Sequence, residues 1–225
     1  MDYQIMEIIK QYTSREELFI ALSDRLEFLI NSLQKHHNIP RVLLSGGSTP
    51  LPVYQRLSQA AIDFSALTLG LVDDRFVPTN DAVSNEGALR TIFSHHPSLN
   101  IIGMVSDAND YEASVVRCNK DYKPFIKGDI AVLGMGNDGH FASLFPNDIP
   151  STEGLQSLNP SCIGTNAPVH PVKRISTNLA FLQSFTHRIL LITGEEKLNK
   201  LKNAEAEKTP ISYIYNSLTE IYYAP

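Results

Sequence analysis

The feature that most constrains the fold of this chain is the alternation of short apolar segments with segments of helical periodicity. Leucines recur at helical spacing from Leu18 onward, and Ser14 and Glu17 before them have capping-box spacing, so a helix is predicted over about 14–37. The apolar segment 41–45 that follows predicts a buried strand. Further strands are predicted at 67–73, 100–104, 130–133, 174–177, 188–193 and 220–223, and further helices at 50–59, 84–94, 107–123 (capped by Asp107) and 194–206.

This alternation predicts an α/β fold, because strands separated by helices form a mainly parallel sheet that helices cover on both faces. The 225 residues suffice for one sizeable core and show no second domain. Residues 1–225 are therefore predicted to form a single α/β domain. Segments 74–84 and 146–171 are predicted to be loops.

The composition argues against several classes of protein. With 43% hydrophobic and 19% charged residues and a net charge of −5, the chain has neither the basic face of a nucleic-acid binder nor that of a protein that binds acidic membranes. No apolar run approaches the ~18 residues of a membrane span, and residues 1–17 lack the pattern of a secretory signal. Cys118 and Cys162 form no Cys-x-x-Cys pair, which is typical of reduced thiols in a cytoplasmic protein.

A glycine-rich loop follows the predicted strand 130–133. Three glycines within residues 134–139 let the backbone approach a ligand closely, and the same loop carries Asp138 and His140. At the carboxyl end of a strand, an acid and an imidazole are suited to proton transfer. The alternative is a strand-to-helix turn in which His140 caps a helix.

A second loop, 45–50, follows a predicted strand and opens a predicted helix. The backbone N–H groups of Gly46, Gly47 and Ser48 can form an anion cradle there. The segment matches neither the Walker A pattern nor G-x-G-x-x-G. A simple tight turn is the alternative interpretation.

The third polar loop, 73–78, brings Asp73, Asp74 and Arg75 together. Arg75 can pair with either carboxylate as a structural salt bridge, or it can hold a substrate oxygen. Because ligands of open α/β sheets bind outside the carboxyl ends of the strands, three polar loops at such ends predict one shared site. Arg174 and Lys197, isolated basic groups at the start of a strand and a helix, are either surface charges or partners of a bound phosphate.

Five segments of the chain carry a resemblance to a known family: Ser45-Gly-Gly-Ser-Thr-Pro50, Val72-Asp-Asp-Arg75, Gly134-Met-Gly-Asn-Asp-Gly-His-Phe-Ala-Ser-Leu-Phe-Pro146, Arg174-Ile-Ser-Thr177 and Ile192-Thr-Gly-Glu-Glu-Lys197. In this order, over roughly residues 40–200, they resemble the 6-phosphogluconolactonases of the glucosamine-6-phosphate isomerase/6-phosphogluconolactonase superfamily. The resemblance departs at Asp74, where the family usually has glutamate.

The resemblance implies hydrolysis of 6-phospho-D-glucono-1,5-lactone to 6-phospho-D-gluconate, the second step of the oxidative pentose phosphate pathway. It also implies a Rossmann-like open sheet, a cytoplasmic location, and no cofactor. The implied partner is a small sugar-phosphate lactone, with no nucleic acid and no membrane. The oligomeric state is not indicated.

The resemblance also suggests roles for catalytic residues. His140 would be the general base that activates water, Asp138 or Asp73 would orient it, and Arg75 would stabilise the developing oxyanion. No G-x-S-x-G motif provides a nucleophilic serine. No second histidine or cysteine stands at ligand spacing from His140, so no metal site is predicted.

The same resemblance places the substrate phosphate on a second group of residues. The cradle of Gly46, Gly47 and Ser48 would hold it, together with Arg174 and Lys197.

Two alternative functions remain at this point. Glucosamine-6-phosphate isomerase/deaminases share the Asp-Gly-His loop but continue it as Ile-Ala-Phe-Asn-Glu-Pro, whereas this chain has Ser143-Leu-Phe-Pro146 and no carboxylate there. A non-catalytic sugar-phosphate sensor is the other alternative, although it would not need His140 or Arg75.

Overall fold

The computed structural model describes residues 8–36 and 38–225. The first seven residues of the predicted domain and His37, at the end of the first predicted helix, lie outside the described residues. The strands are β1 (Ile9–Gln11), β2 (Arg41–Leu44), β3 (Thr68–Leu71), β4 (Asp73–Arg75), β5 (Asn100–Ile101), β6 (Ile130–Gly134), β7 (Cys162–Asn166), β8 (Lys173–Thr177), β9 (His187–Thr193) and β10 (Glu220–Ala224). The helices are α2 (Arg15–Gln34), α3 (Leu51–Leu57), α4 (Asn85–Ile92), α5 (Tyr111–Asp121), α6 (Ile149–Gln156), α7 (Leu179–Gln183), α8 (Glu195–Lys202) and α9 (Ser212–Tyr215), with short 3-10 turns η1 (Phe64–Ala66) and η2 (Lys123–Phe125).

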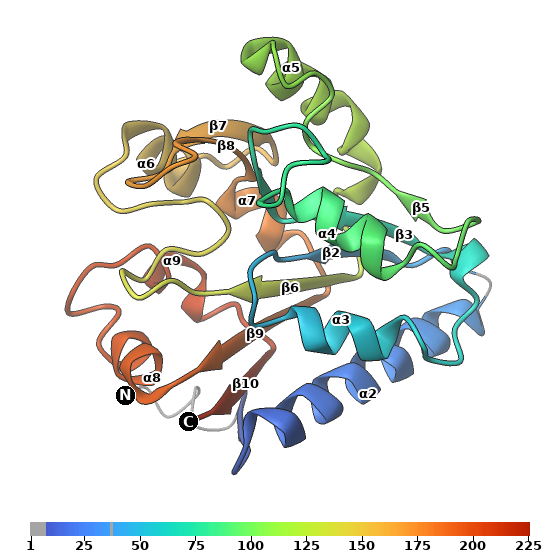
Figure 1. Ribbon diagram of the computed structural model, residues 1–225. Helices are drawn as coiled ribbons and strands as arrows, with labels where there is room; N and C mark the ends of the chain where they lie inside the picture. The colour runs from blue at the N-terminus through green and yellow to red at the C-terminus, as the bar shows by residue number, and fades with distance from the viewer. Residues whose placement is uncertain (1–7, 37) are drawn as a thin grey trace.

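The central sheet is open and parallel, with strand order β1-β10-β9-β6-β2-β3-β5. Helices pack on both sides of it, and α2 and α3 lie side by side (Figure 1). The α/β fold and the mainly parallel sheet predicted from the sequence are therefore confirmed. From β2 the chain adds β3 and β5 on one side and later adds β6, β9, β10 on the other, so the strand order reverses between β2 and β6.

A second, three-stranded antiparallel sheet with order β4-β8-β7 corrects two predictions. The predicted strand 67–73 breaks after Leu71, and Asp73 begins β4 instead. The predicted strand 174–177 exists as β8, but it pairs with β4 and β7 outside the central sheet. Local propensity cannot distinguish these pairings because partners distant in sequence select them.

Other element boundaries differ from the prediction because of local capping and turn chemistry. Helix α5 starts at Tyr111 rather than 107, since Asp110 accepts from the Ala113 N–H while Asp107 closes a turn with Asn109. Segment 146–171 is not wholly irregular, because it contains α6 and β7. The first helix begins as predicted, with the Ser14 side chain accepting from the Glu17 N–H.

The core is the apolar filling between the central sheet and its helices. From α2 it takes Leu18, Leu22 and Leu26, each fully buried, which are the positions at helical spacing in the sequence. The short strands β2 and β6 are buried almost throughout. Cys118 and Cys162 are free and buried within this core. Within the described residues, no helix is both long enough and apolar enough to cross a membrane.

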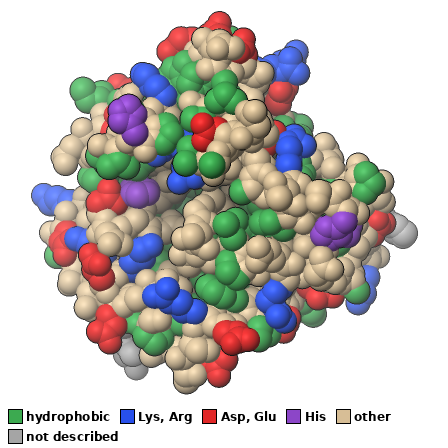
Figure 2. Space-filling view, viewed as in Figure 1, with side chains coloured by type: hydrophobic (Ala, Val, Ile, Leu, Met, Phe, Trp, Pro, Cys, Tyr) green, Lys and Arg blue, Asp and Glu red, His purple; other side chains and the backbone are tan. Residues whose placement is uncertain are grey.

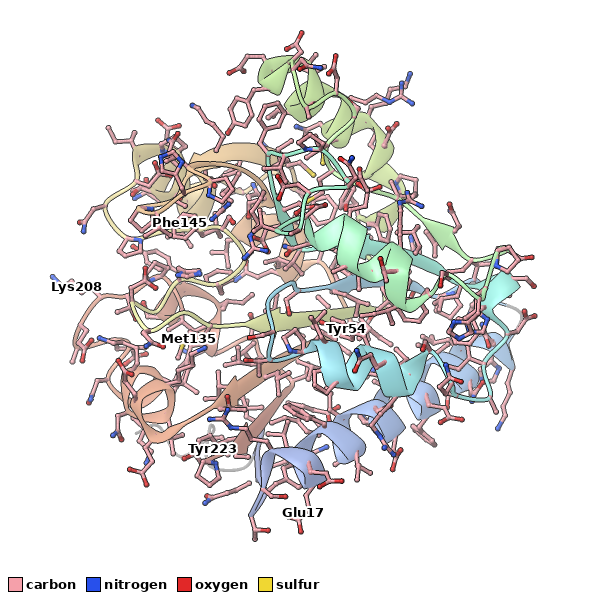
Figure 3. The ribbon with its side chains drawn as sticks, in the orientation of Figure 1. Glu17, Tyr54, Met135, Phe145, Lys208 and Tyr223 are labelled. Carbon is pink, nitrogen blue, oxygen red and sulfur yellow. The ribbon has the colours of Figure 1, made fainter. Side chains whose placement is uncertain are left out.

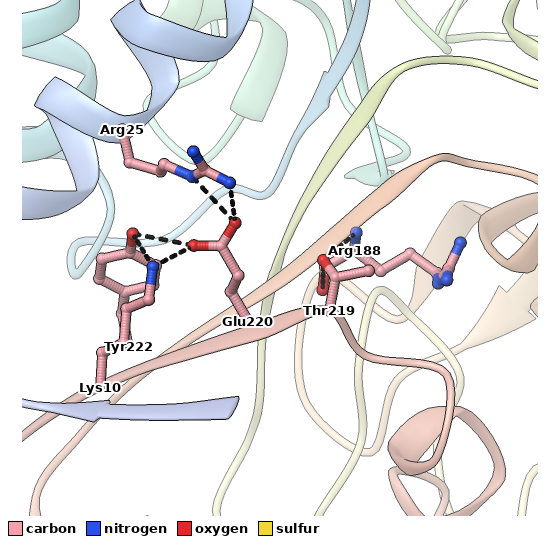
Figure 4. A network of polar contacts seen from close by, with 6 residues as sticks. All are labelled: Lys10, Arg25, Arg188, Thr219, Glu220 and Tyr222. Carbon is pink, nitrogen blue, oxygen red and sulfur yellow. Dashed lines mark hydrogen bonds and ion pairs between the residues drawn. The ribbon is translucent and has the colours of Figure 1, made fainter. Parts of the chain in front are cut away.

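One edge of the sheet is fastened by a buried carboxylate, Glu220, at the start of β10. Arg25 of α2 donates two hydrogen bonds to it, at 2.9 and 2.8 Å, and Lys10 of β1 donates a third at 2.5 Å (Figure 4). The Tyr222 hydroxyl donates to the same carboxylate at 3.1 Å. Burial pushes the pKa of Glu220 upward, but the bonds from Arg25 and Lys10 outweigh it and leave the pKa below its ordinary value.

Replacing Glu220 with glutamine is expected to lower the free energy of unfolding at pH 7 by about 2 kcal/mol, the scale of a hydrogen bond to a charged group. Because the pKa of Glu220 is depressed by folding, its contribution is complete above the pKa of an unfolded glutamate, about 4.3. It is lost as the pH falls through the lower pKa of the folded state. Urea unfolding of both proteins at a series of pH values from 7 downward measures this, and the difference between them should shrink as the pH falls below about 4.3. Glu207→Gln, which breaks the more exposed pair with Lys200, is the control and should cost under about 1 kcal/mol.

Candidate active site

A polar cavity of about 270 Å³ opens where β2 and β6 end, at the point where the strand order reverses. In Figure 2, Lys, Arg and His side chains gather around a hollow left of the centre of the face shown. The predicted shared site thus lies at a topological switch point, where open α/β sheets bind ligands. Its lining comprises residues 45–50, Asp73, Arg75, Asn85, residues 134–136, His140, Ala142, Leu191 and Lys197.

His140 and Asp138 form a hydrogen-bonded pair in the loop after β6. His140 Nδ1 lies 2.6 Å from Asp138 Oδ1, and the His140 backbone N–H donates to the same oxygen at 3.1 Å. The loop can fold back this tightly because residue 136 is a glycine. A Cβ at that position would overlap the His140 ring. Burial raises the pKa of Asp138, but its bonds with His140 prevail and lower it overall, so the carboxylate is ionised at neutral pH.

This pairing assigns the protons of the His140 ring. A carboxylate at Nδ1 selects the tautomer with hydrogen on Nδ1, which leaves the lone pair on Nε2. Among the described residues, Nε2 has no hydrogen-bond partner, and the imidazole lines the cavity. The Phe145 ring packs against the His140 ring at a centroid distance of 4.7 Å. Figure 3 labels Phe145 and, beyond the end of β6, Met135. The predicted alternative of a helix cap does not describe this geometry.

Asp73 and Arg75 reach the cavity from β4. The Ser143 hydroxyl donates to Asp73 Oδ2 at 2.5 Å and thereby holds that carboxylate. Arg75 Nη1 donates to Val83 O at 3.0 Å and to Asn85 Oδ1 at 2.6 Å. The structural salt bridge that the sequence left open is not found, because no ion pair among the described residues joins Arg75 to Asp73 or Asp74.

Asp74 points away from the cavity and holds α4 in place. Its carboxylate accepts from the backbone N–H groups of Arg75, Asn85 and Glu86 at 2.7, 2.8 and 3.0 Å. Burial raises its pKa to about 6, although these N–H groups oppose that shift. The departure from the family's glutamate thus falls on a residue that ties β4 to α4.

The loop 45–50 provides the other wall of the cavity. Gly46, Gly47 and Ser48 all line it, and the Tyr54 hydroxyl of α3 anchors the loop by donating to Ser45 O at 3.0 Å. Lys197, in the first turns of α8, lines the opposite side. Burial lowers the pKa of Lys197.

Arg174 lies behind Arg75 rather than among the lining residues. The two arginines face each other across the β4–β8 pair, and Arg174 is only 6% exposed. Its Nη1 is buried and has no hydrogen-bond partner among the described residues. Burial and the nearby Arg75 charge lower the pKa of Arg174.

Two residues that the sequence interpretation left without a role belong to this site. The sequence predicts Asn85 only as part of the start of the helix 84–94. In the structure, Ser84 caps α4 by accepting from the Gly87 N–H. Ser143 lies within the segment 134–146 that carries the resemblance, but the sequence indicates there only that no carboxylate is present. No local signal identifies either contact, since their partners Arg75 and Asp73 lie 10 and 70 residues away.

The described residues contain no group of three or more His, Cys, Asp or Glu side chains that could hold a metal ion. The chemistry available in the cavity is therefore that of a base on His140, cations on Arg75 and Lys197, and backbone N–H groups.

Comparisons with known proteins identify the family of this chain. A family model described as glucosamine-6-phosphate isomerases/6-phosphogluconolactonase matches residues 13–222. The chain is 34% identical to a 6-phosphogluconolactonase of Xylella fastidiosa over 76% of this chain and 74% of that protein. It is 30% identical to one of Helicobacter pylori over 100% and 99%. The crystal structure of a 6-phosphogluconolactonase from Shewanella baltica superposes with a TM-score of 0.87 at 26% identity, covering 97% of each chain.

Replacing Asp74 with alanine is expected to lower the free energy of unfolding by about 3 kcal/mol, because buried N–H groups at the start of α4 lose their acceptor. Thermal or urea unfolding measures the change. Asp81→Ala, an exposed acid in the neighbouring loop, serves as the control and should change stability by less than about 0.5 kcal/mol. A loss at Asp74 no larger than at Asp81 would contradict the assigned role.

Proposed function

Because the chain belongs to the glucosamine-6-phosphate isomerase/6-phosphogluconolactonase family, we propose that it hydrolyses 6-phospho-D-glucono-1,5-lactone to 6-phospho-D-gluconate. This is the second step of the oxidative pentose phosphate pathway, and we assign the protein to the cytoplasm. The observation that carries the proposal is the Asp138–His140 pair, which presents a free Nε2 to a cavity lined by Arg75 and Lys197.

The chemistry begins with activation of water by His140. Nε2 accepts one proton as the water oxygen bonds to the lactone carbonyl carbon, and Asp138 stabilises the imidazolium that forms. The negative charge that develops on the carbonyl oxygen is met by the Arg75 guanidinium and loop N–H groups. One such donor is worth about 3–4 kcal/mol in other enzymes.

Ring opening completes the reaction. The tetrahedral intermediate collapses, the bond from the former carbonyl carbon to the ring oxygen breaks, and that oxygen takes the proton from His140. The imidazole returns to its starting state, and the carboxylic acid that forms releases its proton to solvent and becomes a carboxylate. No covalent enzyme intermediate is needed.

Positive charge on two sides of the cavity suits the 6-phosphate. Gly46, Gly47 and Ser48 supply backbone and hydroxyl donors, and Lys197 supplies an ammonium group from the opposite wall. Arg174 lies opposite Arg75 in the β4–β8 pair, and its buried Nη1 has no hydrogen-bond partner among the described residues. We assign it to phosphate attraction on this basis.

Two features favour this activity over the alternatives. At the position where the isomerase/deaminases carry a glutamate, this chain carries Phe145, which packs on the His140 ring. A non-catalytic sensor would not require a base oriented by Asp138.

Replacing His140 with alanine is expected to lower kcat by about 100-fold or more, since it removes the general base. Proton release on adding the phosphorylated lactone, corrected for spontaneous hydrolysis, measures the rate. His36→Ala, at an exposed position on α2's end, should retain the wild-type rate. A His140→Ala rate within about threefold of wild type would overturn the assignment, and ammonia release from glucosamine 6-phosphate by the wild type would favour the deaminase.

Replacing Lys197 with methionine is expected to raise KM for the phosphorylated lactone by about tenfold or more, the value of a charged hydrogen bond. Hydrolysis of unphosphorylated gluconolactone should change little. Lys202→Met on the same helix is the control because its side chain is exposed. Equal loss on both lactones would show that Lys197 serves folding or catalysis instead.

The same lysine predicts a pH dependence of product binding. Because burial lowers the pKa of Lys197, its positive charge is lost at a lower pH than that of an exposed lysine. Affinity for 6-phosphogluconate, measured by calorimetry, should therefore weaken as the pH rises into the alkaline range. Lys197→Arg should abolish this decline, and an unchanged decline would exclude Lys197 as its source.

A further inference from the structure

We propose that Asn85 is a positioning residue for this reaction: it fixes the Arg75 guanidinium in the cavity without neutralising its charge. The proposal rests on the proposed function for its activity assay. It stands on three contacts that Asn85 makes with separate parts of the cavity wall.

The first contact orients Arg75. Arg75 Nη1 donates to Asn85 Oδ1 at 2.6 Å and to Val83 O at 3.0 Å, so one end of the guanidinium is held by two neutral acceptors. No carboxylate pairs with Arg75 among the described residues. Its remaining N–H groups and its full charge are thus available to a ligand, in a geometry that the amide sets.

The second contact fixes the amide itself. Asn85 Nδ2 donates to Asp73 O at 2.9 Å, and this assigns which end of the amide faces Arg75. The Asn85 backbone N–H donates to Asp74 Oδ1 at 2.8 Å. Asn85 is only 4% exposed, and these hydrogen bonds hold its side chain in this orientation.

The third contact joins this assembly to the phosphate cradle. A Cβ at Gly46 would overlap the Asn85 amide, so the loop after β2 packs directly on it. Asn85 therefore touches the loop after β2 and the strand that bears Asp73 and Arg75, which form two walls of the cavity.

A double-mutant cycle on lactone hydrolysis tests this role. In the wild-type background, Asn85→Ala should lower kcat about tenfold or more, with KM changed less than about threefold, because misplacing a group that stabilises the transition state costs rate. In an Arg75→Ala background, the same change should lower kcat less than about twofold. Additive losses in the two backgrounds would overturn the proposal, since they would mean that Asn85 acts independently of Arg75.

Asn85→Asp tests the need for a neutral partner. The substitution keeps the shape and the acceptor for Arg75, but it removes the Nδ2 donor to Asp73 O and places a carboxylate beside Arg75. Affinity for 6-phosphogluconate, measured by calorimetry, should therefore fall at least tenfold. An unchanged affinity would contradict the requirement for a neutral partner. Thermal unfolding of each variant identifies any that fails to fold, and the Asp variant retains the test if the Ala variant unfolds.

Asn119→Ala is a matched control. The Asn119 amide also bonds to the backbone at both ends, because it donates to Cys162 O and accepts from the Cys162 N–H. It lies outside the cavity lining and should leave kcat unchanged. If the wild type shows no lactonase activity, the proposed function fails. If the wild type is active but the cycle is additive, only the role of Asn85 fails.

Discussion

The parallel pairing of β2 with β6 is the constraint on which this site depends. Val42 and Leu43 of β2 align with Ile130 and Ala131 of β6, although 88 residues separate the paired positions. The other four strands that follow β2 in the central sheet lie on either side of this pair, β3 and β5 beyond β2 and β9 and β10 beyond β6. Because the two strands end side by side, the loop that bears Gly46 and the loop that bears His140 face each other across the cavity.

The small antiparallel sheet supplies what the central sheet lacks. The chain leaves the central sheet after Leu71, and β4 then brings Asp73 and Arg75 to the cavity. Strand β8 places Arg174 opposite Arg75. Asp74, between the two cavity residues, faces the other way and holds the start of α4. Because successive side chains of a strand point to opposite faces, Asp73 and Arg75 line the cavity, whereas Asp74 between them supports α4.

The charged groups of the cavity are each held by a different kind of partner. Asp138, a carboxylate, sets the tautomer of His140, whereas the Ser143 hydroxyl holds Asp73 and a carbonyl and an amide hold Arg75. Among these groups of the described residues, the imidazole is the one paired with a carboxylate, which suits the proposed general base. The arginine has neutral partners, which orient it and leave its charge to the ligand.

The sequence by itself determined the alternation of strands and helices, the core stripe of α2, the capped start of that helix and the three polar loops at strand ends. These follow from periodicity, capping and glycine content, which act over a few residues. Only the tertiary structure decided that 173–177 leaves the central sheet, that 146–171 contains α6 and β7, and that Asn85 and Ser143 hold Arg75 and Asp73. Helix α6 is capped locally by Asp148. The other outcomes depend on hydrogen bonds between segments that become possible only after the fold has brought their partners together.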